Sequence, residues 1–224
     1  MALRGKGVIV SFIQVPPEHE NELGEWYNRE HLDHRVNFEN FSRARRYVSA
    51  DGSKIFAAMY ESSKVGDFCS PAYLAMLADQ TDWSKRVVKL FSSFDRLACR
   101  VKVDQMTGLG GAISMARFFP EGGKAATLTE WLQSKALPEI VKLPGIVGAG
   151  ALENDLETAN APGRSDGLQY PAVTEAEWVV IVEGADPAAT EGALNKITPQ
   201  DLASFGVKQA PAERSYRMQY ANHR

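Results

Sequence analysis

The chain has 224 residues, of which 44% are hydrophobic and 24% charged, and its formal net charge is −3. This length suits one large domain or two small ones with a real core, and the composition is that of an ordinary globular protein. A slightly acidic chain is not expected to bind nucleic acid or an anionic membrane surface, and apolar runs as short as 178–182 cannot span a bilayer.

The first residues run straight into strand-like sequence at 7–15, without the apolar region and cleavage site of a secretory signal. The two cysteines, Cys69 and Cys99, stand in unrelated local contexts and are interpreted as reduced packing residues. Together these features predict a cytoplasmic protein.

The strand predicted at 7–15 has Val8, Val10 and Phe12 on one face and Ile9, Ser11 and Ile13 on the other. Both faces are largely apolar, which is typical of a sheet covered on both sides. Pro16 and Pro17 end the strand, and Pro17 opens a helix expected to run to about His31, with glutamates in its first turns.

A β-hairpin follows, because Asp51-Gly52 between two extended runs, 42–50 and 54–62, is a strong two-residue turn signal. Two helical stretches and a strand complete the first half, at 71–77, 83–91 and 96–103. The order is therefore β-α-β-β-α-β. Gly108 to Gly111 is interpreted as a short linker.

The second half is predicted to contain a strand, a helix, a strand, two helices and a strand, at 112–119, 125–137, 175–184, 188–194, 200–205 and 213–221. One ungapped offset of 105 residues carries Val8 to Ile113 and Trp26 to Trp131, while Tyr60 matches Val182 at an offset of 122. The difference predicts an insertion in a loop at 153–171. We therefore expect a first ferredoxin-like repeat at 1–107, which is the candidate active half, and a second at 108–224.

Each βαββαβ unit places both helices on one face of its sheet and leaves the other face bare. Because a bare apolar sheet has to be buried, the two sheets are expected to pack face to face. The predicted fold is α+β, with two fused ferredoxin-like repeats whose antiparallel sheets form a barrel within one chain. Such a chain could be a monomer or associate as a homodimer.

The segment Trp26-Tyr27-Asn28-Arg29-Glu30-His31-Leu32, followed by residues 41–47, resembles the dimeric α+β barrel superfamily and, within it, the EthD-like group. Residues 70–74, with Trp83 after them, strengthen the likeness. The resemblance implies a scaffold with many uses: cofactor-free monooxygenases, polyketide cyclases or dehydratases, muconolactone isomerases, haem-degrading and haem-dependent enzymes, and stress proteins. The fold alone does not decide among them.

His31 is the leading catalytic candidate. Its repeat partner is Ala136, so the histidine is not needed merely to hold the helix in place. Imidazole can accept and return a proton near neutral pH, and in the EthD-like group the matching histidine is implied to point into a pocket. The alternative is a partly buried histidine that bonds a backbone carbonyl.

Tyr27 is the second catalytic candidate, because it lies four residues before His31 and shares its helical face. Its repeat partner is Leu132, so the hydroxyl occurs in one half only. A phenol there could donate a hydrogen bond to a substrate carbonyl or phenolate. An aromatic core residue whose hydroxyl reaches solvent would explain the same pattern. Trp26 is matched by Trp131 and is interpreted as core.

Five further residues are candidates for substrate binding: His34, Arg35, Arg45, Tyr73 and Trp83. Arg35 could hold an anionic or enolate oxygen, or instead form a surface ion pair. Arg45 shares a strand face with Arg43, with Arg46 on the other face, and a solvated strand end is the competing interpretation. Tyr73 and Trp83 could wall the pocket or simply pack.

Several kinds of site are not indicated. The histidines and cysteines form no metal-binding pattern, and the sequence contains no HExxH, dinucleotide, P-loop or nucleophile-elbow motif. No cofactor and no metal site is therefore predicted, although His31 and His34 at i, i+3 leave weak metal or haem binding open.

The favoured hypothesis is a cofactor-independent enzyme that acts on a small aromatic, quinone-like or polyketide-like compound. His31 would transfer a proton with help from Tyr27, in a monooxygenase, isomerase or dehydratase type of reaction. The alternatives are a non-catalytic ligand-binding or stress-related protein on the same scaffold and, third, a haem-binding protein. The expected partner in each case is a small, largely apolar molecule.

Overall fold

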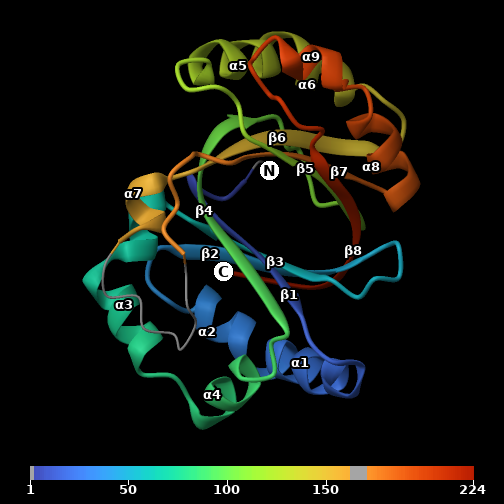
Figure 1. Cartoon of the computed structure of the whole chain (residues 1–224). Coiled ribbons are helices and arrows are strands. Elements are labelled where there is room, and N and C mark those ends of the chain that lie inside the picture. Colours follow the sequence, from blue (N-terminus) through green and yellow to red (C-terminus); the bar gives the residue numbers. More distant parts are fainter. Residues whose placement is uncertain (1–2, 162–170) are drawn as a thin grey trace.

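A computed structural model of the chain describes residues 3–161 and 171–224. Eight antiparallel strands close into a barrel in the order β1-β3-β2-β8-β5-β7-β6-β4 (Figure 1). The strands are β1 Gly7–Gln14, β2 Phe41–Ser49, β3 Phe56–Ser62, β4 Ser93–Asp104, β5 Ala112–Phe118, β6 Ile146–Asn154, β7 Trp178–Gly184 and β8 Ala212–His223.

Two four-stranded sheets make up the barrel, β4-β1-β3-β2 from the first half and β6-β7-β5-β8 from the second. They join where β2 pairs with β8 and where β4 pairs with β6. The chain is thus an α+β protein built from two fused ferredoxin-like repeats whose sheets form an intrachain barrel, as the sequence predicts.

The helices lie outside the barrel, those of the first repeat on one side and most of those of the second on the opposite side (Figure 1). The first group is η1 Pro17–His19, α1 Glu20–Trp26, η2 Tyr27–His31, α2 Leu32–Val36, η3 Val65–Cys69, α3 Pro71–Ala78 and α4 Asp82–Val88. The second is α5 Ala125–Trp131, η4 Leu132–Ala136, α6 Leu137–Ile140, α7 Leu156–Ala159, α8 Pro187–Leu194 and α9 Pro199–Ala203. No helix among the described residues is long and apolar enough to cross a membrane.

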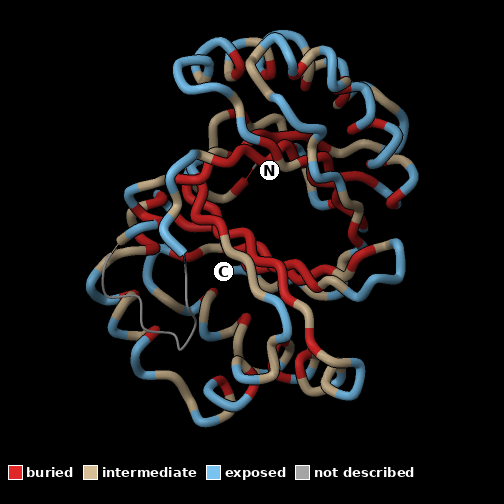
Figure 2. The backbone as a smooth tube through the Cα atoms, in the orientation of Figure 1, coloured by how far each residue is buried: buried red, intermediate tan, exposed pale blue. Residues whose placement is uncertain are grey.

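The predicted alternation of β1 is confirmed. Val8, Val10 and Phe12 belong to the core inside the barrel, whereas Ile9 and Ile13 pack under the helices of the first repeat. Burial is concentrated on the strands, while the outer helices expose one side to solvent (Figure 2). The sheet of the first half is therefore covered on both faces, and its outer face can form the floor of a binding site.

The first long helix continues past the expected end at His31. It runs on through a π-helical turn, η2, to Val36. The matching turn η4 in the second repeat is also π-helical and lies 105 residues later. Although π turns are often found at functional sites, this one occurs in both repeats, so it is a property of the scaffold.

Two connections differ from simple expectation. At the predicted linker, the N–H of Gly110 donates to the Glu183 carboxylate (3.2 Å), so that end of the linker is fixed to the barrel. Of the loop predicted at 153–171, residues 153–154 end β6 and Leu156–Ala159 form α7, while 162–170 lie outside the described residues.

Candidate active site

A cavity of about 320 Å³ lies between the outer face of the first repeat's sheet and the helices that cover it. Strands β1, β3 and β4 supply one wall, and η2, α2, α3 and α4 supply the others. Seven aromatic side chains line it: Trp26, Tyr27, Phe38, Tyr60, Tyr73, Phe91 and Phe94. The volume is at the lower end of the range for small-molecule sites, and the lining suits a flat, largely apolar ligand.

His31 faces this cavity from the π turn. Its ring packs against Trp26 in a tilted arrangement with centroids 4.0 Å apart, and it meets Tyr27 and Tyr60 edge-on at 5.3 and 5.8 Å. Within the described residues the imidazole has no hydrogen-bond partner. Burial, followed by the charges of Arg35 and His34, holds the pKa of His31 well below its ordinary value of 6.5. The ring is therefore neutral at neutral pH and keeps a free lone pair.

Tyr27 and Tyr60 form a pair of phenols beside the histidine. The Ser11 hydroxyl and the Tyr60 phenol lie close to the Tyr27 hydroxyl, and all three side chains line the cavity. Burial raises the pKa of Tyr27 to about 12 and that of Tyr60 well above its ordinary value. Both phenols therefore stay protonated and can act as hydrogen-bond donors near His31.

The Trp26 indole, against which the His31 ring packs, is itself held in place by a hydrogen bond. Trp26 Nε1 donates to Ser84 Oγ (3.0 Å), and Ser84 Oγ donates to Glu30 Oε1 (2.8 Å), which also accepts from Thr81 Oγ1 (2.6 Å). Thr81 caps α4 by accepting from the Ser84 N–H. The start of α4 and the π turn are thus joined by one chain of hydrogen bonds, which holds the Trp26 ring against which His31 packs.

Three of the five predicted binding residues line the cavity with His31 and Tyr27: His34, Arg35 and Tyr73. The Arg35 guanidinium lies 5.3 Å from the centroid of the Tyr73 ring, and its Nη1 contacts Met76 Sδ at 3.1 Å. Arg35 makes no ion pair with any described residue, so the alternative of a surface ion pair is wrong.

The other two candidates lie elsewhere. Trp83 is absent from the cavity lining and donates its indole N–H to Glu22 Oε1 (2.7 Å) on the outside of the helix layer. Arg45 is wholly buried inside the barrel, on the opposite face of the sheet from the cavity. Neither residue can touch a ligand held beside His31.

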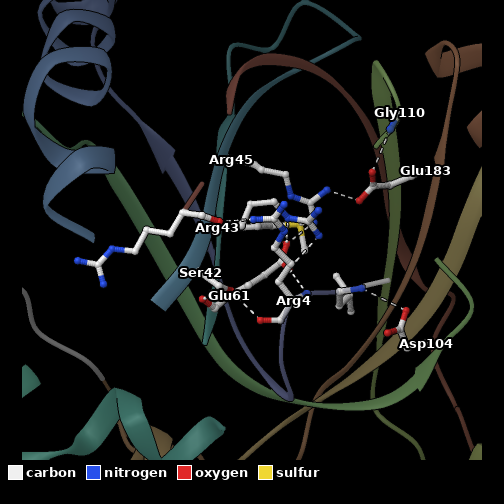
Figure 3. A network of polar contacts seen from close by, with 11 residues as sticks. Arg4, Ser42, Arg43, Arg45, Glu61, Asp104, Gly110 and Glu183 are labelled. Carbon is white, nitrogen blue, oxygen red and sulfur yellow. Dashed lines mark hydrogen bonds and ion pairs between the residues drawn. The ribbon is translucent and has the colours of Figure 1, made fainter. Parts of the chain in front are cut away.

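Arg45 belongs to a polar network that crosses the barrel (Figure 3). It bonds Glu61 Oε1 at 3.0 Å and forms an ion pair with Glu183, while Arg43 bonds both oxygens of Glu61 at 2.7 and 2.8 Å. The prediction that Arg43 and Arg45 share a face is confirmed, since Arg46 points the other way and donates to Gly24 O. A solvated strand end is wrong, because all three arginines are buried.

Tyr60 and Arg96 line the cavity without having been predicted as site residues, and Ser11 was predicted only as part of a strand face. Ser11 and Arg96 are direct cross-strand partners on β1 and β4, so their side chains leave the same face of the sheet. The alternation Ile9-Ser11-Ile13 was the available signal, because it places one hydroxyl on an otherwise apolar face.

The corresponding position of the second repeat has lost the polar groups. Ala136 stands where the first repeat has His31, and Val182 where it has Tyr60. A larger hollow of about 830 Å³ does occur in that half, beside the end of β5. Its principal cation, Arg117, is already engaged by Glu177 (2.7 Å) and Asp95 (2.6 Å). The first cavity is therefore the better candidate.

No protein-family model and no curated protein sequence matches the chain. Among solved structures, an anthrone oxidase-like protein is similar with a TM-score of 0.68 over 97% of this chain and 93% of that one, at 12% identity. A protein from Lactobacillus acidophilus proposed to be a monooxygenase gives a TM-score of 0.62 over 97% and 96%, at 10% identity. A heme-binding protein from Thermus thermophilus gives 0.53 over 98% and 93%, at 9% identity. At such identities the likeness shows a shared fold.

Proposed function

We propose that the chain is an enzyme that removes a proton from a small aromatic, quinone-like or polyketide-like compound without a bound cofactor. The observation that carries this proposal is the neutral, unpartnered imidazole of His31 in a cavity walled by aromatic rings. Such an imidazole is ready to act as a general base at neutral pH.

The mechanism follows from the groups around the ring. A planar substrate lies among the aromatic side chains with its acidic C–H or O–H toward the free lone pair of His31. The proton moves to the imidazole. The electron pair of the broken bond stays on the substrate, which becomes an enolate or phenolate. Tyr27 donates a hydrogen bond to the new oxyanion, because its high pKa keeps the phenol protonated.

The fate of this carbanion-like species decides the type of reaction. Attack on O₂ would make the protein a monooxygenase, return of the proton to another carbon an isomerase, and loss of a hydroxyl group a dehydratase. Similarity to an anthrone oxidase-like protein and the EthD-like motif at residues 26–32 favour testing the first. Anthrone is a suitable probe, because its acidic CH₂ flanks two aromatic rings.

Deuterium exchange at the anthrone CH₂ in D₂O under argon, followed by NMR, tests the proton transfer alone. Wild-type protein is expected to accelerate exchange, and His31→Ala to reduce the rate to that of buffer. His223→Ala, which removes an exposed histidine, is the matched control. Admitting O₂ then tests oxygenation, in which one anthrone and one O₂ give anthraquinone and water.

The alternative is a protein that binds an aromatic ligand without turning it over, which the same lining supports. Binding of anthrone with no exchange in wild-type protein would favour it.

Haem binding is the third candidate, supported by the accessible His31 imidazole and the likeness to a heme-binding protein. It predicts a Soret band on adding haem that is lost in His31→Ala.

A further inference from the structure

The candidate cavity carries an excess of positive charge. Arg35 from α2 and Arg96 from β4 both line it. The acidic residue in the described lining is Asp79, which is exposed where α3 ends. Two guanidinium groups therefore face an aromatic cavity, and Asp79 at its rim is the one carboxylate among the described lining residues.

Arg96 lies on the strand side of the cavity. It is the cross-strand partner of Ser11, so its side chain leaves the same face of the sheet as the Ser11 hydroxyl. Its Nη2 is buried without a hydrogen-bond partner. The neighbouring carboxylate, Asp95, does not reach it, because Asp95 is bonded to Arg117 at 2.6 Å. A buried guanidinium nitrogen without an acceptor is unfavourable unless a bound group supplies one.

Arg35 lies at the other end of the cavity. It rests on the Tyr73 ring, and its one close polar contact among the described residues is the Met76 sulfur, a weak acceptor. Its remaining donors are not engaged. By contrast, Arg43 and Arg45 inside the barrel each bond a glutamate, at 2.7 and 3.0 Å.

We propose that the ligand of this cavity is an aromatic carboxylate, whose ring lies among the aromatic side chains and whose carboxylate binds Arg35 or Arg96. This rests on the proposed function in so far as both place a small aromatic compound beside His31. Guanidinium is suited to the task, because its donors match the two oxygens of a carboxylate. A desolvated, positively charged cleft also selects for anions over neutral compounds of equal shape.

Calorimetric titration of the full chain with 2-naphthoate and with its uncharged analogue 2-naphthamide tests the inference. Wild-type protein is expected to bind the naphthoate at least about tenfold more tightly, since charge-assisted hydrogen bonds in a water-poor site are worth that much. Arg35→Gln or Arg96→Gln is expected to abolish the preference while leaving naphthamide affinity unchanged. Arg96→Lys, which keeps the charge, should retain part of it.

Arg29→Gln is the matched control, because Arg29 lies on the same helical segment but is exposed and pairs with Glu25 outside the cavity. His31→Ala removes the proposed base and should keep the preference for naphthoate. Equal affinities for the two compounds in wild-type protein would overturn the inference and leave the aromatic site standing. A preference that survives in both arginine variants would also overturn it. Failure of both compounds to bind would overturn the inference and the proposed function together.

Discussion

Arg45 in β2 and Glu183 in β7 form an ion pair inside the barrel although 138 residues separate them in the chain. The same guanidinium also holds Glu61, which occupies the matching place in the first repeat. Gly150 of the second repeat stands 105 residues after Arg45, so that repeat supplies no arginine of its own here. One side chain therefore bridges a buried carboxylate from each half, and Arg43 supplies the second positive charge.

Replacing Arg45 with Met should lower the free energy of unfolding by about 3–5 kcal/mol, because it leaves Glu183 buried without its charged partner. Urea denaturation followed by circular dichroism measures the change. Arg214→Met serves as the comparison, since Arg214 pairs with Asp51 at the surface and should cost no more than about 1 kcal/mol. Equal effects of the two substitutions would show that the barrel network does not stabilise the fold.

His31 predicts a particular dependence of stability on pH. In the unfolded chain His31 takes up a proton near its ordinary pKa of 6.5, whereas in the folded protein burial keeps it neutral to a lower pH. The unfolded state therefore binds more protons as the pH falls below 6.5, and the folded state loses stability. His31→Gln should reduce this loss. An NMR titration in which the pKa of His31 in the folded protein is 6.5 or higher would contradict the prediction.

Ser84→Ala should destabilise the protein by about 1–3 kcal/mol, because it leaves the buried Trp26 N–H and one bond of Glu30 unpaired. The variant should also weaken ligand binding beside His31, since Trp26 supports that ring. Thermal denaturation and ligand titration measure the two effects. Ser134→Ala, whose hydroxyl is exposed and bonds a carbonyl of its own helix, should change neither.

The linker offers a steric test. A Cβ on Gly110 would lie 2.3 Å from the backbone oxygen of Gly184, whereas one on Gly108 would meet nothing within 4 Å. Gly110→Ala should therefore lower the melting temperature markedly, and Gly108→Ala should leave it nearly unchanged. A Gly110→Ala protein as stable as the wild type would mean that the connection can shift without disturbing β7.

Local patterns were enough to predict most of the fold. The hairpin forms around Asp51-Gly52, with φ +81° at Gly52, and the alternation of β1 assigned its two faces correctly. The expected two-residue turn is wrong, because β2 ends at Ser49 and β3 begins at Phe56, so the loop is longer. Strand β6 was not recognised as a separate element, because the glycines and alanines of Ile146–Asn154 have little intrinsic preference for a strand. Only the repeat, which aligns Phe41 with Ile146, points to it.

Part of the candidate site could be predicted from the sequence. Tyr27 and His31 come together because helical spacing places them on one face, and the repeat comparison drew attention to both. Arg45 was misplaced because strand alternation assigns a face but does not say which face is the barrel interior. The partner of Arg45 lies in the other repeat, where local sequence carries no information about it. The roles of these residues in binding and catalysis remain predictions.

The junctions β2–β8 and β4–β6 bring together two repeats of one chain, so each repeat can change in sequence independently of the other. In a barrel assembled from two identical chains, every substitution would appear twice, once on each side of the axis. Here an arginine of one repeat can correspond to a glycine of the other, and the polar residues His31 and Tyr60 can correspond to Ala136 and Val182. We therefore expect a saturated chain to hold one ligand molecule beside His31, with no second equivalent place through which binding could become cooperative.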